Sequence, residues 1–308
     1  MSDGSTPVRP RWGIRSRSGE PWVTRVCDLL VALGGRTESG ATIFAKNSDR
    51  PPDERQFVES IPSRVESVTE ATYISIPGAD GPTRACVISR PEWGWGAEHG
   101  VNDRGVAIGN ATIYTTLDPR PFPDALTGMD LVRLGVERAD SARAALDVIV
   151  ALIDEFGQGG SGHAPDRPRR PYWSSFLIAD ATEAWVLETS GPDRAFERVN
   201  GARAVSNRVT IASFDDRRHR RQPVATLVDP RLDATREFLA TGAVSIESVQ
   251  RHLATHGQGV DGWDVCMHVE GVERTTASMV VEIPGAGRPV VRVAAGNPCS
   301  AEWHDIEW

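Results

Sequence analysis

The order in which strand-like and helix-like segments follow one another constrains the fold of this chain more than any other feature. Two helical patterns interrupt a series of strands, and a second pair interrupts it again. The strand-like runs lie at 26–33, 41–47, 71–77, 84–89, 105–114, 173–180, 183–190, 203–211, 277–284 and 289–296. The helical patterns lie at 124–139, 141–157, and near 230–241 and 245–256. This order excludes a parallel sheet built from alternating strands and helices, and it predicts an α+β fold with antiparallel layers.

The length of 308 residues allows one large core or two domains. No Pro- and Ser-rich linker divides the chain after residue 27, so we expect a single domain over 27–308. The first 26 residues are rich in Arg, Pro, Gly and Ser and contain no apolar stretch of the kind found in secretory signals. We therefore expect residues 1–26 to form a flexible leader that precedes the first strand.

Charge and hydropathy exclude two classes of partner. The formal net charge is -8, whereas a nucleic-acid-binding protein would carry a basic footprint. No apolar run approaches the ~20 residues that a membrane-spanning helix needs. Four cysteines in so long a chain are typical of a reducing compartment, so we expect a cytoplasmic location.

The cysteines and histidines are the residues that would reveal a metal or redox site. No two cysteines form a C-x-x-C pair, so their spacing indicates neither a zinc site nor a redox motif, and Cys266 is expected to be buried and inert. His252 and His256 lie four residues apart, but no glutamate follows the first, so a zinc-peptidase motif is not supported. We therefore predict no metal and no cofactor. The four cysteines are Cys27, Cys86, Cys266 and Cys299.

The first two strands gather reactive groups. Residues 27–50 read CDLLVALGGRTESGATIFAKNSDR, in which a Gly-rich turn joins two strands in a predicted hairpin. The hairpin brings Cys27 toward Lys46, the only lysine of the chain, and Asp49. A cysteine at a strand start is more often a small buried hydrophobe than a nucleophile. If the leader were cut at the Val26–Cys27 bond, however, Cys27 would gain an α-amine with an unperturbed pKa of about 7.7–8. Asp49 could orient that amine, and Lys46 could lower the pKa of the thiol.

Several blocks of the sequence resemble the secernin and dipeptidase A family of cysteine peptidases. These are N-terminal-nucleophile (Ntn) hydrolases related to the choloylglycine hydrolases and penicillin V acylases. The first block is CDLLVALGGRTESGATIFAKNSDRPPDERQ, and WGAEHGVNDRGVAIGNATIYT and YWSSFLIADATEAWVLETSG resemble the second and third. Later blocks are AVSNRVTI, VCMHVEG, RTTASMV and NPCSAEW. The resemblance implies a four-layer αββα sandwich, with two antiparallel sheets between helix layers.

The resemblance also implies roles for residues around Cys27. Cys27 would be the nucleophile, exposed by removal of the leader, and would form a thioester acyl-enzyme with an amide substrate. Asp49 matches the acid that holds the α-amine. Lys46 lies where the bile-salt-hydrolase relatives carry an arginine.

Three further positions match the family pattern. Asn110, in IGNATIY, matches a position that helps to form the oxyanion hole, and Asn207, in VSNRV, matches the second active-site asparagine. Arg274, in RTTAS, lies where relatives place an arginine that supports the cysteine. Amide NH2 groups suit an oxyanion hole because they donate hydrogen bonds without ionising. Apart from this pattern, Trp93 and Trp95, beside Glu98 and His99, are candidates to line a substrate pocket.

The resemblance leaves several readings open. The leading one is a dipeptidase acting on small peptides. An acylase or acyltransferase acting on an N-acyl amide would use the same nucleophile, and a non-catalytic secernin-like regulatory protein would use none. The leader is either a propeptide removed by Cys27 itself, a retained segment, or the result of a start codon placed too early. Whether the protein forms a homo-oligomer is also open.

Overall fold

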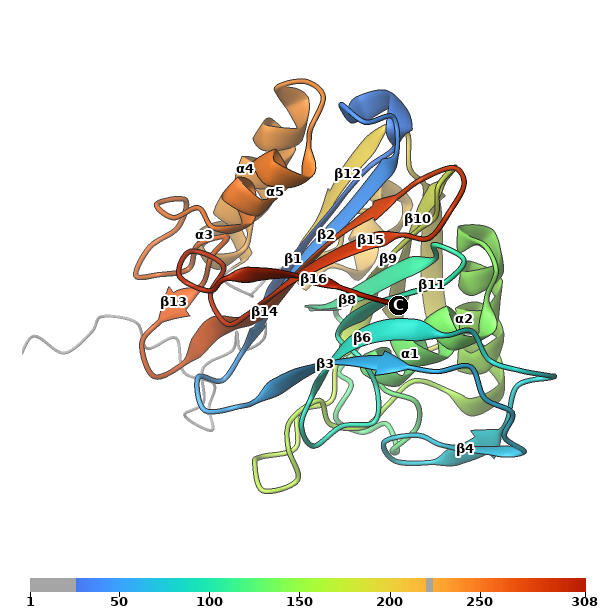
Figure 1. Ribbon diagram of the computed structural model, residues 1–308. Coiled ribbons are helices and arrows are strands. Elements are labelled where there is room, and N and C mark those ends of the chain that lie inside the picture. The colour runs from blue at the N-terminus through green and yellow to red at the C-terminus, as the bar shows by residue number, and fades with distance from the viewer. Residues whose placement is uncertain (1–25, 220–223) are drawn as a thin grey trace, which may run out of the picture.

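The computed structural model describes residues 26–219 and 224–308, and Figure 1 shows two β-sheets between two layers of helices. Of the leader expected over residues 1–26, only Val26 lies within the described residues. Every pairing between the named strands is antiparallel, which confirms the expected α+β class. No helix of the described residues is long and apolar enough to cross a membrane.

The first sheet contains the predicted hairpin near its centre. Its order is β12 (Ala202–Val205), β1 (Cys27–Ala32), β2 (Thr42–Arg50), β14 (Glu273–Ile283), β15 (Val290–Ala295) and β16 (Trp303–Ile306), and β13 (His268–Val269) pairs with β14 beside this path. In the hairpin Cys27 pairs with Ser48 and Leu29 with Lys46. On the other side of β2, Asp49 pairs with Thr275, and the register then shifts between Thr275 and Ala277. Such a bulge redirects the side chains beside it.

The second sheet packs against the first. Its order is β11 (Asp193–Arg198), β10 (Ala184–Ser190), β9 (Trp173–Ala179), β8 (Ala107–Ile113), β7 (His99–Asn102), β6 (Cys86–Pro91) and β3 (Gln56–Ile61). A separate small ribbon pairs β4 (Val68–Glu70) with β5 (Ser75–Pro77).

Helices cover the outer face of each sheet, as Figure 1 shows. α1 (Gly128–Arg138) and α2 (Ala142–Phe156) contact the second sheet, and α4 (Asp229–Ala240) and α5 (Ile246–Leu253) contact the first. α3 (Val224–Leu227) precedes α4, and two short 3-10 turns lie at Gly34–Arg36 and Ala212–Arg217. Thr127 begins α1 with a capping box, and the Ser141 side chain caps α2.

The alternation of side chains along β1 shows why its sequence is apolar throughout. Leu29 and Val31 belong to the core between the two sheets, together with Phe44 of β2. Leu30 and Ala32 belong to a different core, between the first sheet and α4 and α5. Because successive side chains of a strand point to opposite faces, a central strand of this sandwich is buried on both.

The structure corrects several sequence-based boundaries. The strand predicted over 203–211 ends at Val205, because Ser206 and Asn207 turn their side chains to β1 instead of continuing the ladder. The strands β3, β4, β7, β11, β13 and β16 lie outside the predicted runs, since each is short or carries several polar residues. The hairpin and all four predicted helices lie where expected to within a few residues.

Candidate active site

Cys27 begins β1 and is nearly inaccessible. It is 4 % exposed, and it borders the core between the two sheets. Its backbone N–H donates to Asn207 Oδ1 at 2.8 Å, and its Sγ lies 4.0 Å from Glu98 Oε2. The same alternation that buries Leu29 and Val31 between the sheets places the thiol there and directs Asp28 to the opposite face.

Lys46 lies between the sheets next to this thiol and is fully buried. Its ammonium donates to Glu98 O at 3.0 Å, to Glu98 Oε2 at 2.8 Å and to Asn110 O at 2.5 Å. All three donors of the ammonium are therefore used, which is what makes a buried charge tolerable. Gly109 allows this approach, because a Cβ at that position would meet Lys46 Cδ at 3.1 Å and Leu29 Cδ2 at 2.7 Å.

Glu98 joins two cations and faces the thiol. One carboxylate oxygen accepts from Lys46, and the other accepts from Arg50 Nη1 at 2.8 Å. Arg50 also donates from Nε to Glu54 Oε1 at 2.5 Å. Although burial lowers the pKa of Lys46, its neighbours Cys27 and Glu98 outweigh that effect and raise it, so the ammonium is charged at neutral pH.

Asn110, on β8, presents its amide to the same carboxylate. With Nδ2 toward Glu98, the amide donates to Glu98 O at 3.3 Å and to Glu98 Oε2 at 3.2 Å. This orientation is assigned from the hydrogen-bond network, as is usual for an amide. Gly128 makes room for the group, since a Cβ there would lie 2.7 Å from the amide atom of Asn110 that faces away from Glu98, its Oδ1 in this orientation. An amide NH2 thus lies within the same cluster as the Cys27 thiol.

A second charged cluster occupies the helix-facing side of the hairpin. The carboxylate of Asp28 accepts from Ser206 Oγ at 2.7 Å and from the guanidinium of Arg231, which is fully buried on α4. Arg231 also donates from Nη2 to Asn207 Oδ1 at 3.2 Å, and its Nη1 lies 3.9 Å from Asp49 Oδ2. Asn207 Oδ1 therefore accepts from both Cys27 N and Arg231, and its Nδ2 donates to Thr112 O at 3.0 Å.

Asp49 is only partly satisfied by this cluster. Its Oδ1 accepts from Thr275 Oγ1 at 2.7 Å, whereas its Oδ2 has no hydrogen-bond partner among residues 26–219 and 224–308. Burial and the nearby Asp28 carboxylate raise the pKa of Asp49 well above its usual range, against the opposing effect of Arg231. One guanidinium is thus shared by two buried carboxyl groups, and a further cation beside Asp49 would complete the charge balance.

The thiol of the intact chain is held in its neutral form. Burial raises the pKa of Cys27 to about 12, the positive charge of Lys46 opposes that rise, and the carboxylates Glu98 and Asp49 add to it. Because the thiolate is the nucleophile, attack by this sulfur requires that the thiol proton be transferred away.

The structure brings together five of the six predicted site residues and leaves one apart. Arg274 is exposed on β14 beside the buried Thr275, because the alternation along the strand turns it outward. The buried arginine that contacts the helix-facing cluster is Arg231. The five residues that lie together are Cys27, Lys46, Asp49, Asn110 and Asn207.

Sequence reasoning missed two residues of the site. Glu98 is identified from the sequence only as a pocket-lining candidate. The lone lysine in a buried strand could have indicated it, because a buried ammonium requires a carboxylate partner. Arg231, in DPRLD, looks like an ordinary residue at the start of a surface helix, and nothing in the sequence distinguishes it.

Comparisons with known proteins agree with this architecture. No protein-family model matches the sequence. The penicillin V acylase from Agrobacterium tumefaciens has a similar structure, with a TM-score of 0.56 and 11% identity over 91% of this chain and 86% of that one. A variant of the conjugated bile acid hydrolase from Clostridium perfringens has a TM-score of 0.54 and 10% identity, over 91% of this chain and 97% of that one. The Caenorhabditis elegans ortholog of N-acylethanolamine-hydrolyzing acid amidase has a TM-score of 0.50 and 12% identity, over 84% of this chain and 94% of that one.

These likenesses define the fold. The protein has the αββα sandwich of the Ntn hydrolases, with two antiparallel sheets between helix layers, as the sequence resemblance implied. Identities of 10% to 12% establish the fold alone. The narrower resemblance to the secernin and dipeptidase A family stays a prediction.

Proposed function

We propose that this protein is an amide hydrolase whose nucleophile is Cys27 after removal of the residues before it. The observation that carries the proposal is the arrangement around the Val26–Cys27 bond. Asn207 Oδ1 accepts from Cys27 N, and Asp49 Oδ2 is a buried acceptor without a hydrogen-bond partner among the described residues. A freed α-amine would carry additional N–H donors and, when protonated, a positive charge. Both fit the vacant acceptor and the surplus negative charge beside it.

Removal of the leader follows from the chemistry of a cysteine next to its own preceding carbonyl. The Cys27 thiol attacks the carbonyl carbon of Val26, the carbon–nitrogen bond breaks, and the nitrogen takes the thiol proton. The leader is then held as a thioester, which water hydrolyses to a carboxylic acid and the free thiol. Asp49 N donates to Val26 O at 3.2 Å, so this carbonyl is already polarised and oriented by a hydrogen bond.

Turnover uses the same groups on a substrate amide. The free α-amine takes the proton of the thiol, and the sulfur attacks the substrate carbonyl while Lys46 favours the thiolate by its charge. In this proposal the Asn110 NH2, which donates to Glu98 in the intact chain, turns to donate to the oxyanion, and one such donor typically contributes ~10²–10³ in rate. The proton then passes to the leaving amine, and water hydrolyses the thioester. Asn207 and Asp49 are positioning residues that hold the amine.

Two substrate classes follow from different observations. The sequence blocks resemble dipeptidases, which supports dipeptides as the leading candidates. The neighbours in fold are named as an acylase, a bile acid hydrolase and an amidase, which supports N-acyl amides as the second class.

A substrate panel tests the proposal and separates these classes. The full chain is assayed against dipeptides and N-acyl amino acids, next to Cys27→Ala and to Cys86→Ala, which removes a buried cysteine elsewhere in the core. We expect hydrolysis by the wild type and by Cys86→Ala, and none by Cys27→Ala. Activity that survives in Cys27→Ala contradicts the proposal. Activity on N-acyl amides alone reverses the order of the two classes. Folded, processed protein without activity and with an unreactive Cys27 thiol favours a regulatory scaffold.

A further inference from the structure

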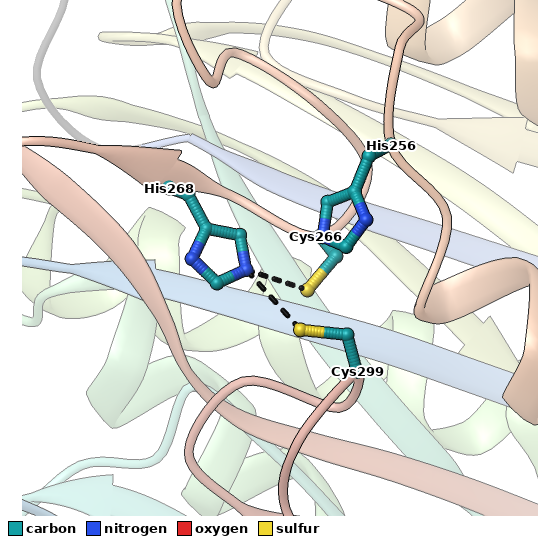
Figure 2. Close-up of side chains that lie close together, drawn as sticks. All are labelled: His256, Cys266, His268 and Cys299. Atoms are coloured by element: carbon teal, nitrogen blue, oxygen red, sulfur yellow. Dashed lines mark hydrogen bonds between the residues drawn. The ribbon is translucent and has the colours of Figure 1, made fainter.

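Two cysteines and two histidines from three separate segments meet outside the cluster around Cys27, with Cys266 buried and the other three exposed. His256 follows α5, Cys266 precedes β13, His268 begins β13, and Cys299 lies in the turn between β15 and β16. Their ligand atoms all lie within 4.8 Å of one another. Figure 2 shows the His268 ring directed at both sulfur atoms, with the His256 ring on the other side of Cys266.

The distances between these atoms resemble those between the ligands of one tetrahedral metal. His268 Nε2 lies 3.4 Å from Cys266 Sγ and 3.3 Å from Cys299 Sγ. Zinc bonds of about 2.3 Å to sulfur and about 2.0 Å to nitrogen at tetrahedral angles would place a nitrogen and a sulfur roughly 3.5 Å apart. The His256 and His268 ring centroids are 5.0 Å apart and tilted by 55°, so the rings are not stacked on each other.

From this convergence we propose that His256, Cys266, His268 and Cys299 form a structural zinc site. The donors are two thiolates and two imidazoles, the set that selects zinc over the harder cations such as magnesium and calcium. Half of the four cysteines and two of the seven histidines of the chain lie in this one cluster. The site is independent of the proposed hydrolase activity.

Backbone and amide contacts hold the ligand segments in place. Cys266 N donates to Thr255 O at 3.0 Å, which ties the residue before His256 to the residue that carries the buried sulfur. Asn297 Nδ2 donates to Met267 O at 2.8 Å and lies 3.9 Å from Cys266 Sγ. N–H groups near the sulfur of a metal thiolate are typical supporting contacts of such sites.

The metal would connect two parts of the chain at the edge of the candidate active site. It would join segment 256–268 to the turn that carries Cys299. Met267, inside that segment, packs against Val26. Its backbone N–H donates to Thr275 Oγ1 at 2.9 Å. Thr275 in turn donates to Asp49. The zinc site would therefore brace the segment whose Met267 packs against Val26.

Sequence spacing could not reveal this cluster. Only Cys266 and His268 are close in sequence, separated by one residue, and the other two ligands lie 10 residues before and 33 residues after Cys266. The expectation that the cysteines indicate no zinc site followed from the missing C-x-x-C pair, and the fold supplies the proximity that the sequence does not show.

Cobalt titration of the full reduced chain tests the proposal, with Co²⁺ alone as the probe. We expect one Co²⁺ per chain with the visible bands of a tetrahedral site and a near-ultraviolet thiolate-to-cobalt band. Zn²⁺ should displace it, because zinc binds such donors more tightly. Two thiol protons leave on binding, so the apparent affinity rises with pH. Zinc at a hundredfold excess over its dissociation constant should raise the melting temperature by about 5 °C.

Matched variants locate the metal. His256→Gln and Cys299→Ser remove exposed ligands, so folding is preserved, and each should weaken cobalt binding at least ~100-fold. Cys299→Ser should also lower the thiolate-to-cobalt band by about half. His304→Gln, another exposed histidine, and Cys27→Ala should leave the spectrum unchanged. Reduced protein without a stoichiometric tetrahedral cobalt spectrum overturns the proposal. A spectrum that survives both ligand variants, or one that Cys27→Ala removes, overturns it too.

Discussion

Asp49 donates its backbone N–H to the carbonyl oxygen of Val26 at 3.2 Å, while its own Oδ2 has no hydrogen-bond partner among the described residues. One residue thus holds the carbonyl of Val26 through its backbone and also carries a buried carboxylate oxygen without a hydrogen bond. The arrangement follows from the register of the first hairpin. Cys27 pairs with Ser48, so Asp49 falls opposite the residue that precedes the nucleophile.

Asp49→Asn should impair an enzyme that works through a free α-amine. The amide keeps the size of the side chain but not its charge, so the amine would be less firmly oriented and its pKa would fall. We expect kcat/KM to drop by about 10²-fold, and the limb of the pH profile that reports the amine to move to lower pH. The measurement is kcat/KM against pH for both proteins. A reduced rate with an unmoved profile would indicate a purely structural role.

Lys46→Met should destabilise the protein by removing the partner of a buried carboxylate. The variant leaves Glu98 with Arg50 alone, and breaking a buried ion pair typically costs about 3–5 kcal/mol. The free energy of unfolding is measured with denaturant. The double variant Lys46→Met with Glu98→Gln should recover part of the loss, because the uncompensated charge is removed. If the losses of stability in the two single variants simply add in the double variant, Lys46 and Glu98 are not energetically coupled, which would contradict this prediction.

Arg231 and Arg274 form a matched pair that distinguishes the structure from the family pattern. Arg231→Met removes a fully buried guanidinium shared by Asp28, Asp49 and Asn207, so we expect a loss of about 3 kcal/mol or more in stability. Arg274→Met removes an exposed side chain and should change stability by less than about 0.5 kcal/mol. Chemical denaturation of both variants measures these changes in the free energy of unfolding. A large effect at Arg274 would restore the role that the sequence resemblance implied.

His252 should make the protein sensitive to acid. Burial lowers the pKa of His252 to about 4 from an ordinary value of 6.5, and its Nε2 is 2.9 Å from Thr235 Oγ1. A depressed pKa means that the unfolded chain binds the proton more tightly than the folded one. The stability that neutral His252 contributes is therefore present above pH 6.5 and is lost as the pH falls toward 4. Between those values the wild type should lose about 3 kcal/mol relative to His252→Gln. Denaturant unfolding of both proteins at pH 7 and pH 4 measures this difference, and parallel pH dependence would contradict it.

The sequence predicted the parts of the fold that local patterns control. The hairpin at 26–47 and the helices at 124–139 and 141–157 rest on turn residues, helix caps and hydrophobic periodicity, and all of them are present. The edge strands β3, β11 and β16 carry polar residues on short segments, so only pairing with a neighbour defines them.

The residues of the candidate site also fall into those that local sequence patterns predict and those that only the folded chain brings together. Cys27, Lys46 and Asp49 share one hairpin, so their proximity follows from the register of two adjacent strands. Glu98 and Arg231 reach the hairpin from β7's preceding loop and from α4, and such contacts between distant segments exist only in the folded chain. The four residues of the proposed zinc site are a further case, since the turn after β15 brings Cys299 to β13.

The most direct test of the central claim is the intact mass and N-terminal sequence of the purified protein, compared with Cys27→Ala expressed in parallel. If Cys27 removes its own leader, the wild type begins at Cys27, whereas Cys27→Ala retains residues before position 27. A wild-type chain that keeps Val26 joined to Cys27 would have no free α-amine, and it would contradict the proposal of an N-terminal nucleophile.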